Sequence, residues 1–316
     1  MGFVAGPCVR EGGDDASKKT EPGTEGSTDG ETAPAPQFGV SPVMSGLPIE
    51  EDEEGKYLIE RHSLRVAPSI GTVIELQRCV AARPTPSKPS ALVVGDPSFG
   101  GSGCSRDDVD SDSSACWAQS LPGARKEARR INSLLEDTDA YEDSVKKMVG
   151  DDAGKVAVVE AMRSCDVIHL ATHGEPSAVL LGGATRAEGV LSMAEVQRLD
   201  LEARLVVLSE CDSFKGELKA DGVIGITRAF VAAGAPTLVA SLWEVSDVAT
   251  RKLMTRFYDA LLGPEAAGDV AVALQARVGT HFPAVSRRHA PSLKSCNGLF
   301  LHLPCRSARL AQRQSE

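Results

Sequence analysis

The chain has 316 residues, enough for two average domains or for one large domain with tails. Its net charge of −10 argues against nucleic acid as the main partner. Only 4% of the residues are aromatic, so a core must be built from Val, Leu, Ile and Ala. That composition suits helices packed on a buried, mostly parallel sheet.

The eight cysteines form no C-x-x-C pair and, with the six histidines, show no spacing typical of a zinc site. The sequence starts with no secretory signal, and no apolar run reaches the roughly 18 residues of a membrane span. We therefore expect free thiols, no metal or other cofactor, no membrane partner and a cytoplasmic location.

Strands and helices alternate along the chain after a polar start. Residues 1–44 are rich in Gly, Glu, Ser and Pro and predict a disordered tail, and residues 45–280 predict one α/β domain. In chain order, the expected elements are a strand at 57–65, a helix at 68–79, a strand at 91–95, helices at 121–136 and 153–163, a strand at 165–171, a helix at 192–199, a strand at 204–209, a helix at 221–233, a strand at 237–243, and helices at 248–262 and 269–278. The expected loops are 99–120, 174–189 and 212–220.

One reactive side chain follows each of two successive buried strands. His173 comes just after the strand at 165–171, and Cys211 just after the strand at 204–209. A right-handed crossover places both at the carboxyl edge of one sheet, where open α/β sheets hold their sites. His173 is expected to take the thiol proton, and the N–H groups of Gly174 and Cys211 are expected to bind a developing oxyanion.

Other nearby residues have a structural interpretation. A lone buried cysteine is usually an inert part of the core, and Cys165, at the start of its strand, fits that description. His169 lies inside the strand, so we expect it to pack or to make a structural hydrogen bond. The Gly-rich string at 93–103 suggests a nucleotide-binding protein, but it lacks the lysine of a P-loop.

Several segments, in order, resemble the CHAT domain, a family in the caspase-like clan of cysteine peptidases. They are HLATHGE (169–175), LVVLSECDS (205–213), DGVIGITRAFVAAGAPTLVASLW (221–243), EVSDVAT (244–250) and, upstream, YLIERHSLRVAPSI, ALVVGDPSF and LPGARKEARRINSLL. The resemblance covers residues 45–280. It implies a caspase-like three-layer α/β/α sandwich, with the family's histidine at His173 and its nucleophile at Cys211.

The resemblance also implies an acidic floor in the pocket for the first substrate residue. Related clan members carry an acidic residue after the SLW strand, a position that Asp247 fits, with Glu244 as a nearby candidate. Such a floor favours Arg or Lys before the cut. The alternative is that Asp247 only caps the helix that follows.

The sequence departs from the family in two places. Glu210 stands directly before Cys211, where the family often has a small residue; strand alternation directs it away from the thiol. Residues 281–316 match the family's last strand poorly, although 297–303 can supply a substitute edge strand.

The resulting interpretation is a cysteine endopeptidase. It cleaves protein substrates through Cys211 and His173, under control of self-cleavage or of a partner such as a tetratricopeptide-repeat protein. The alternative is a catalytically silent interaction module with the same fold.

Overall fold

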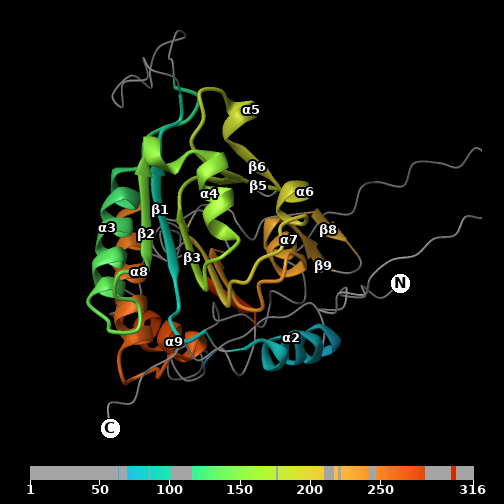
Figure 1. The fold of residues 1–316 in the computed structure, drawn as a ribbon, viewed down its shortest axis with the longest axis vertical. Helices are drawn as coiled ribbons and strands as arrows, with labels where there is room; N and C mark the ends of the chain where they lie inside the picture. The colour runs from blue at the N-terminus through green and yellow to red at the C-terminus, as the bar shows by residue number, and fades with distance from the viewer. Residues whose placement is uncertain are drawn as a thin grey trace, which may run out of the picture.

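A six-stranded sheet runs through the middle of the molecule (Figure 1). The computed structural model describes residues 63, 70–84, 86–100, 116–175, 177–209, 217–219, 222–241, 247–281 and 300–303. The strands of the sheet are β1 (Ala91–Pro97), β2 (Val145–Gly150), β3 (Val167–Ala171), β7 (Leu205–Ser209), β10 (Leu238–Ser241) and β11 (Phe300–Leu303). Their order is β11-β10-β7-β3-β1-β2, and only β11 is antiparallel to its neighbour. The predicted mostly parallel sheet is confirmed.

Helices cover both faces of this sheet and give the predicted three layers. The first layer holds α3 (Pro122–Glu136), α8 (Asp247–Leu262) and α9 (Val270–His281), and the second holds α4 (Lys155–Met162), α6 (Met193–Val196) and α7 (Ile226–Ala232). Strand residues alternate between the layers: Val167 packs with the first set and Ile168 with the second. Figure 1 shows α3 and α8 on one side of the sheet and α4 and α7 on the other.

The central strands were predictable because they are buried on both faces. Every residue of β1, β3 and β7 is buried, as their continuous aliphatic runs indicated. The edge strand β2 was missed, since its exposed Lys146 and Lys147 give it no such run. The 3-10 helix η1 (Asp151–Ala153) connects β2 to α4.

The expected loop at 174–189 is wrong for most of its length. It contains β4 (Gly174–Glu175), β5 (Ala178–Leu180) and α5 (Arg186–Gly189), and with β6 (Val190–Ser192) the two strands make a small antiparallel sheet. Strands of two or three residues are too short to show a period in the sequence. The predicted capping box of Ser192 and Glu195, however, is present at the start of α6.

A second hairpin changes the start of a predicted helix. Strands β8 (Glu217–Lys219) and β9 (Gly222–Ile224) pair antiparallel, so α7 begins later than expected. It still ends before Gly234, whose φ of 112° suits glycine and stops the helix. Helix α2 (Ile70–Ala82) matches its prediction closely, whereas the tail at 1–44 and nearly all of the strand at 57–65 lie outside the described residues.

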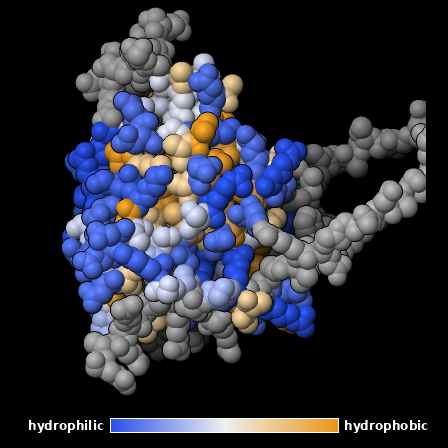
Figure 2. All heavy atoms as spheres, viewed as in Figure 1, coloured by the Kyte–Doolittle hydropathy of each residue, from blue (hydrophilic) through white to orange (hydrophobic). Residues whose placement is uncertain are grey.

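The face of the molecule seen in Figure 2 is mainly polar. Hydrophilic side chains cover most of it, with hydrophobic residues between them near the centre (Figure 2). In the described part of the chain, no helix combines the length and the hydropathy needed to cross a membrane. The edge strand β11 lies inside the segment at 297–303 that was considered a substitute strand.

Gly95 allows α3 to lie directly on β1. A Cβ added at Gly95 would lie 2.7 Å from the carbonyl oxygen of Ala124 and would also overlap the side chain of Ala128. We expect Gly95→Ala to lower the free energy of unfolding by about 1–3 kcal/mol, because it overpacks this contact. Chemical denaturation measures the change. Gly154→Ala is the matched control, since its Cβ would meet nothing within 4 Å; an equal loss in both variants would contradict the close-packing explanation.

Candidate active site

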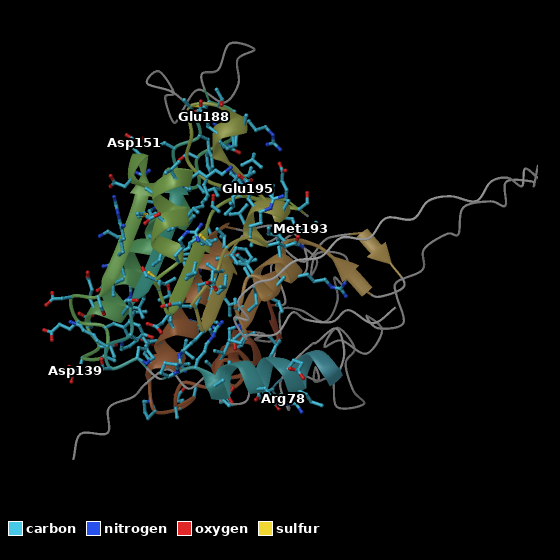
Figure 3. The ribbon with its side chains drawn as sticks, turned by 45° about the vertical axis from the view of Figure 1, so that its right-hand side comes forward. Arg78, Asp139, Asp151, Glu188, Met193 and Glu195 are labelled. Carbon is cyan, nitrogen blue, oxygen red and sulfur yellow. The ribbon has the colours of Figure 1, made fainter. Side chains whose placement is uncertain are left out.

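The pairing of β3 with β7 brings the ends of the two strands that precede the predicted catalytic residues to one edge of the sheet. The parallel register pairs Ala171 with Ser209, the last residues of the two strands. His173 and Cys211 each follow their strand end by two residues. In Figure 3, Asp151, which follows β2, and Glu188 of α5 lie at this carboxyl end, while Asp139, which follows α3, lies at the opposite end. Cys211 itself, like the rest of 210–216, lies outside the described residues.

Two contacts hold the imidazole of His173: a hydrogen bond to one ring nitrogen and the packing of an aromatic ring against it. Its Nε2 lies 2.7 Å from the backbone oxygen of Gln119, and its ring packs against Phe99 with ring centres 5.3 Å apart. Because a carbonyl oxygen only accepts hydrogen bonds, Nε2 carries the hydrogen. In the neutral ring, Nδ1 therefore keeps the lone pair that a general base needs.

Gly174 presents its N–H away from the small sheet. It faces Val179 across the β4–β5 pair, and the N–H of Leu180 donates to the carbonyl of His173 at 3.0 Å. Hydrogen-bonded and non-hydrogen-bonded pairs alternate along antiparallel strands, so Gly174 occupies a non-hydrogen-bonded position. This orientation leaves its N–H directed away from β5, as an oxyanion donor requires.

Phe99, which packs against His173, is itself held by an aromatic contact. The ring of Phe99 meets Trp117 edge to face at 5.1 Å, and the indole Nε1 of Trp117 donates to the oxygen of Gly183 at 2.9 Å. Sequence reasoning missed Phe99 and Gln119. Both lie in the expected loop at 99–120. Gln119 contributes its backbone carbonyl, which every residue type has, so its identity gives no signal in the sequence.

The cysteines do not all behave as expected. Cys116 is disulfide-bonded, which corrects the expectation of free thiols throughout; its bond extends beyond the residues that the structure describes. Cys165 is free and buried, and burial is the main cause that raises the pKa of its thiol. A raised pKa keeps the thiol protonated, in agreement with the structural interpretation of Cys165.

His169 makes structural hydrogen bonds in the core. Its Nε2 lies 3.0 Å from Oε1 of Glu127 in α3, and its Nδ1 lies 3.4 Å from the hydroxyl of Tyr258 in α8. All three side chains are buried, and burial is the main cause that raises the pKa of Tyr258. The expectation of a structural hydrogen bond is confirmed, and His169 lies inside β3 and not beyond its carboxyl end.

Of the two residues expected to form the acidic floor, the structure describes only the backbone of Asp247. Asp247 is the first residue of α8 and follows β10, whose parallel pairing with β7 brings its end to the same edge. The side chain of Asp247 and the whole of Glu244 lie outside the described residues. Among the residues that are described, no group of three or more His, Cys, Asp or Glu side chains is placed to hold a metal ion.

Comparisons with known proteins agree with the resemblance seen in the sequence. The family described as "CHAT domain" matches residues 42–292. Tetratricopeptide repeat protein 28 of Mus musculus is 25% identical over 258 residues, which cover 68% of this chain and 10% of that protein. Its counterpart in Homo sapiens is 26% identical with the same coverage. The chain therefore spans about one tenth of the length of these curated relatives.

Two solved structures are similar to parts of the chain. The Arg-specific cysteine proteinase gingipain R is 13% identical, with a TM-score of 0.41 over 61% of this chain and 42% of that one. The separase of the Saccharomyces cerevisiae separase–securin complex is 13% identical, with a TM-score of 0.45 over 70% of this chain and 13% of that one. The family match spans most of the sequence and all of the central parallel strands, and the chain belongs to the CHAT domain family.

Proposed function

We propose that the chain is a cysteine endopeptidase that cleaves proteins through Cys211 and His173. The observation that carries the proposal is the β3–β7 register, in which the paired ends Ala171 and Ser209 precede the two residues by the same distance. Membership of the CHAT family supports it further.

The proposed reaction begins with proton transfer. Nδ1 of His173 takes the proton of the Cys211 thiol, and the thiolate attacks the carbonyl carbon of the peptide bond. The N–H groups of Gly174 and Cys211 stabilise the negative oxygen that forms. The C–N bond then breaks, and the leaving amine takes the proton from the imidazolium. In the second half, His173 accepts a proton from water, whose oxygen attacks the thioester, and the acid and the free thiol are released.

The fixed tautomer of His173 supports this division of roles. Gln119 occupies Nε2, so the hydrogen cannot exchange freely between the two nitrogens without loss of that 2.7 Å contact. The packing of Phe99 against the ring adds a second constraint on its orientation. A base that is already oriented loses little entropy when the substrate binds.

Substrate preference and regulation are part of the proposal. An acidic pocket formed by Asp247, with Glu244, would bind Arg or Lys before the cut by charge-assisted hydrogen bonds. The names of the relatives as tetratricopeptide repeat proteins support a tetratricopeptide-repeat protein as the regulatory partner. A cytoplasmic location remains a part of the proposal.

We expect Cys211 to be the fastest thiol in the chain. Near pH 6, its alkylation rate should exceed that of the buried Cys165 by about tenfold or more, because His173 lowers the pKa of the thiol. His173→Ala should remove most of this advantage and leave Cys165 unchanged. Mass spectrometry of alkylated peptides over a range of pH gives both rates.

The contrary result favours the silent interaction module. If Cys211 in the folded wild type reacts no faster than Cys165, and His173→Ala changes nothing, the catalytic proposal fails.

We expect Asp247→Asn to reduce kcat/KM for peptides with Arg or Lys before the cut by about 10- to 100-fold, since a buried charge-assisted contact is lost. Peptides with an apolar residue at that position should be cleaved as before. The exposed Asp259, on the same helix, provides the matched control Asp259→Asn. Equal losses for basic and apolar substrates would show that Asp247 only caps α8; Glu244→Gln tests the second acidic residue in the same assay.

A further inference from the structure

We propose that Asp96, at the end of β1, is a positioning residue that fixes His173 through the segment 119–121. This inference rests on the proposed peptidase function and adds a residue to it. Asp96 does not contact His173. Instead, it accepts hydrogen bonds from the two residues that follow Gln119 in the chain, Ser120 and Leu121. The carbonyl of Gln119 accepts the hydrogen bond from Nε2 of His173.

The carboxylate of Asp96 is buried, and three donors surround it. The hydroxyl of Ser120 lies 3.0 Å from Oδ1, the backbone N–H of Leu121 lies 2.7 Å from the same oxygen, and Nε of Arg125 lies 2.8 Å from Oδ2. Asp96 is only 2% exposed. A buried carboxylate with this many partners holds them in one arrangement, because each broken bond would leave the buried negative charge with one donor fewer.

These contacts act on the two residues that follow Gln119. The carbonyl of Gln119 belongs to the peptide that joins it to Ser120, so the position of Ser120 sets the direction of that carbonyl. The carboxylate of Asp96 accepts one hydrogen bond from the side chain of Ser120 and one from the backbone N–H of Leu121, which belongs to the next peptide. On the other side of Gln119, two residues earlier, the backbone N–H of Trp117 donates to the backbone oxygen of Phe99 at 2.8 Å. The carbonyl therefore lies between two anchors.

The backbone of Asp96 supports a positioning role. Its φ is 49°, in the left-handed region that residues other than glycine rarely adopt. Aspartate tolerates this conformation better than most side chains do. Residues held in such a conformation cluster at functional sites, where the surrounding structure enforces it. At Asp96, the conformation turns the carboxylate towards the start of α3 and the segment 119–121.

The consequence for His173 is a fixed tautomer. With the carbonyl of Gln119 in place, Nε2 keeps the hydrogen and Nδ1 remains the base. Without the carboxylate, the segment loses its anchor after Gln119, the carbonyl moves, and the imidazole samples both tautomers. The fraction of enzyme whose imidazole is both correctly oriented and free at Nδ1 falls, so kcat decreases and KM changes little.

The test uses the full chain with Asp96→Asn. Nitrogen-15 NMR of the His173 imidazole reports the tautomer directly and needs no substrate. We expect the wild type to show almost exclusively the Nε2–H form and the variant to show a larger fraction of the Nδ1–H form. The kcat on a cleaved peptide should fall by about 10- to 100-fold, as for other losses of alignment in an active site.

Asp166 offers a matched control at the opposite edge of the sheet. It accepts hydrogen bonds from the N–H of Ser90 at 2.8 Å and from the Ser90 hydroxyl at 3.5 Å, and it lies 3.9 Å from Arg204. Asp166→Asn should lower stability as Asp96→Asn does, but it should leave the tautomer of His173 and kcat unchanged. Ser120→Ala removes one donor and keeps the carboxylate, so it should shift the tautomer in the same direction by a smaller amount. This variant replaces Asp96→Asn in the test if Asp96→Asn fails to fold.

The outcomes separate this inference from the proposed function. A tautomer that shifts in Asp96→Asn while Cys211 remains unreactive in the wild type supports the positioning role and refutes the peptidase. A reactive Cys211 together with an unchanged tautomer in the foldable Asp96 or Ser120 variant overturns the positioning role and leaves the peptidase standing. A tautomer that shifts equally in Asp166→Asn also overturns it, because the effect would then be general destabilisation.

Discussion

The parallel pairing of β3 with β7 is the constraint on which the site depends. Because Ala171 pairs with Ser209, any residue at a fixed distance beyond one strand has a counterpart beyond the other. A slip of one residue would turn the strand side chains to the opposite layer of the core, and the buried aliphatic faces on both sides prevent such a slip. The register that packs the core is thus the same register that aligns Ala171 and Ser209, the strand ends that precede His173 and Cys211.

The two histidines of the β3 region show how position decides chemistry. His169 is inside the strand, where Glu127 and Tyr258 use both ring nitrogens and no solvent reaches it. His173 is beyond the strand end, where Gln119 uses only Nε2. The same side chain is therefore a structural link at His169 and keeps a nitrogen for the proposed base role at His173, four residues later.

The sequence predicted what depends on local residue pattern, and it missed what depends on backbone contacts. Strands β1, β3, β7 and β10 and the helices α2, α3, α8 and α9 follow from aliphatic runs and amphipathic spacing. Strand β2 was not predicted because it has exposed residues at the edge of the sheet, and β4–β6 were not predicted because they are too short to show a pattern. The carbonyl of Gln119 and the reach of Asp96 across to Leu121 could not be predicted, since both connect segments brought together only by the fold.

Cys211 and His173 are proposed to form one site, and a short bifunctional reagent tests their proximity directly. 1,3-Dibromoacetone alkylates a reactive thiol and then a second nucleophile within reach of its three-carbon bridge, with loss of two molecules of hydrogen bromide. We expect one dominant cross-link, between Sγ of Cys211 and the imidazole of His173, identified by mass spectrometry of the joined peptides and absent in His173→Ala. A reagent that attaches only at Cys211, or that links Cys211 to a different residue, would contradict the account.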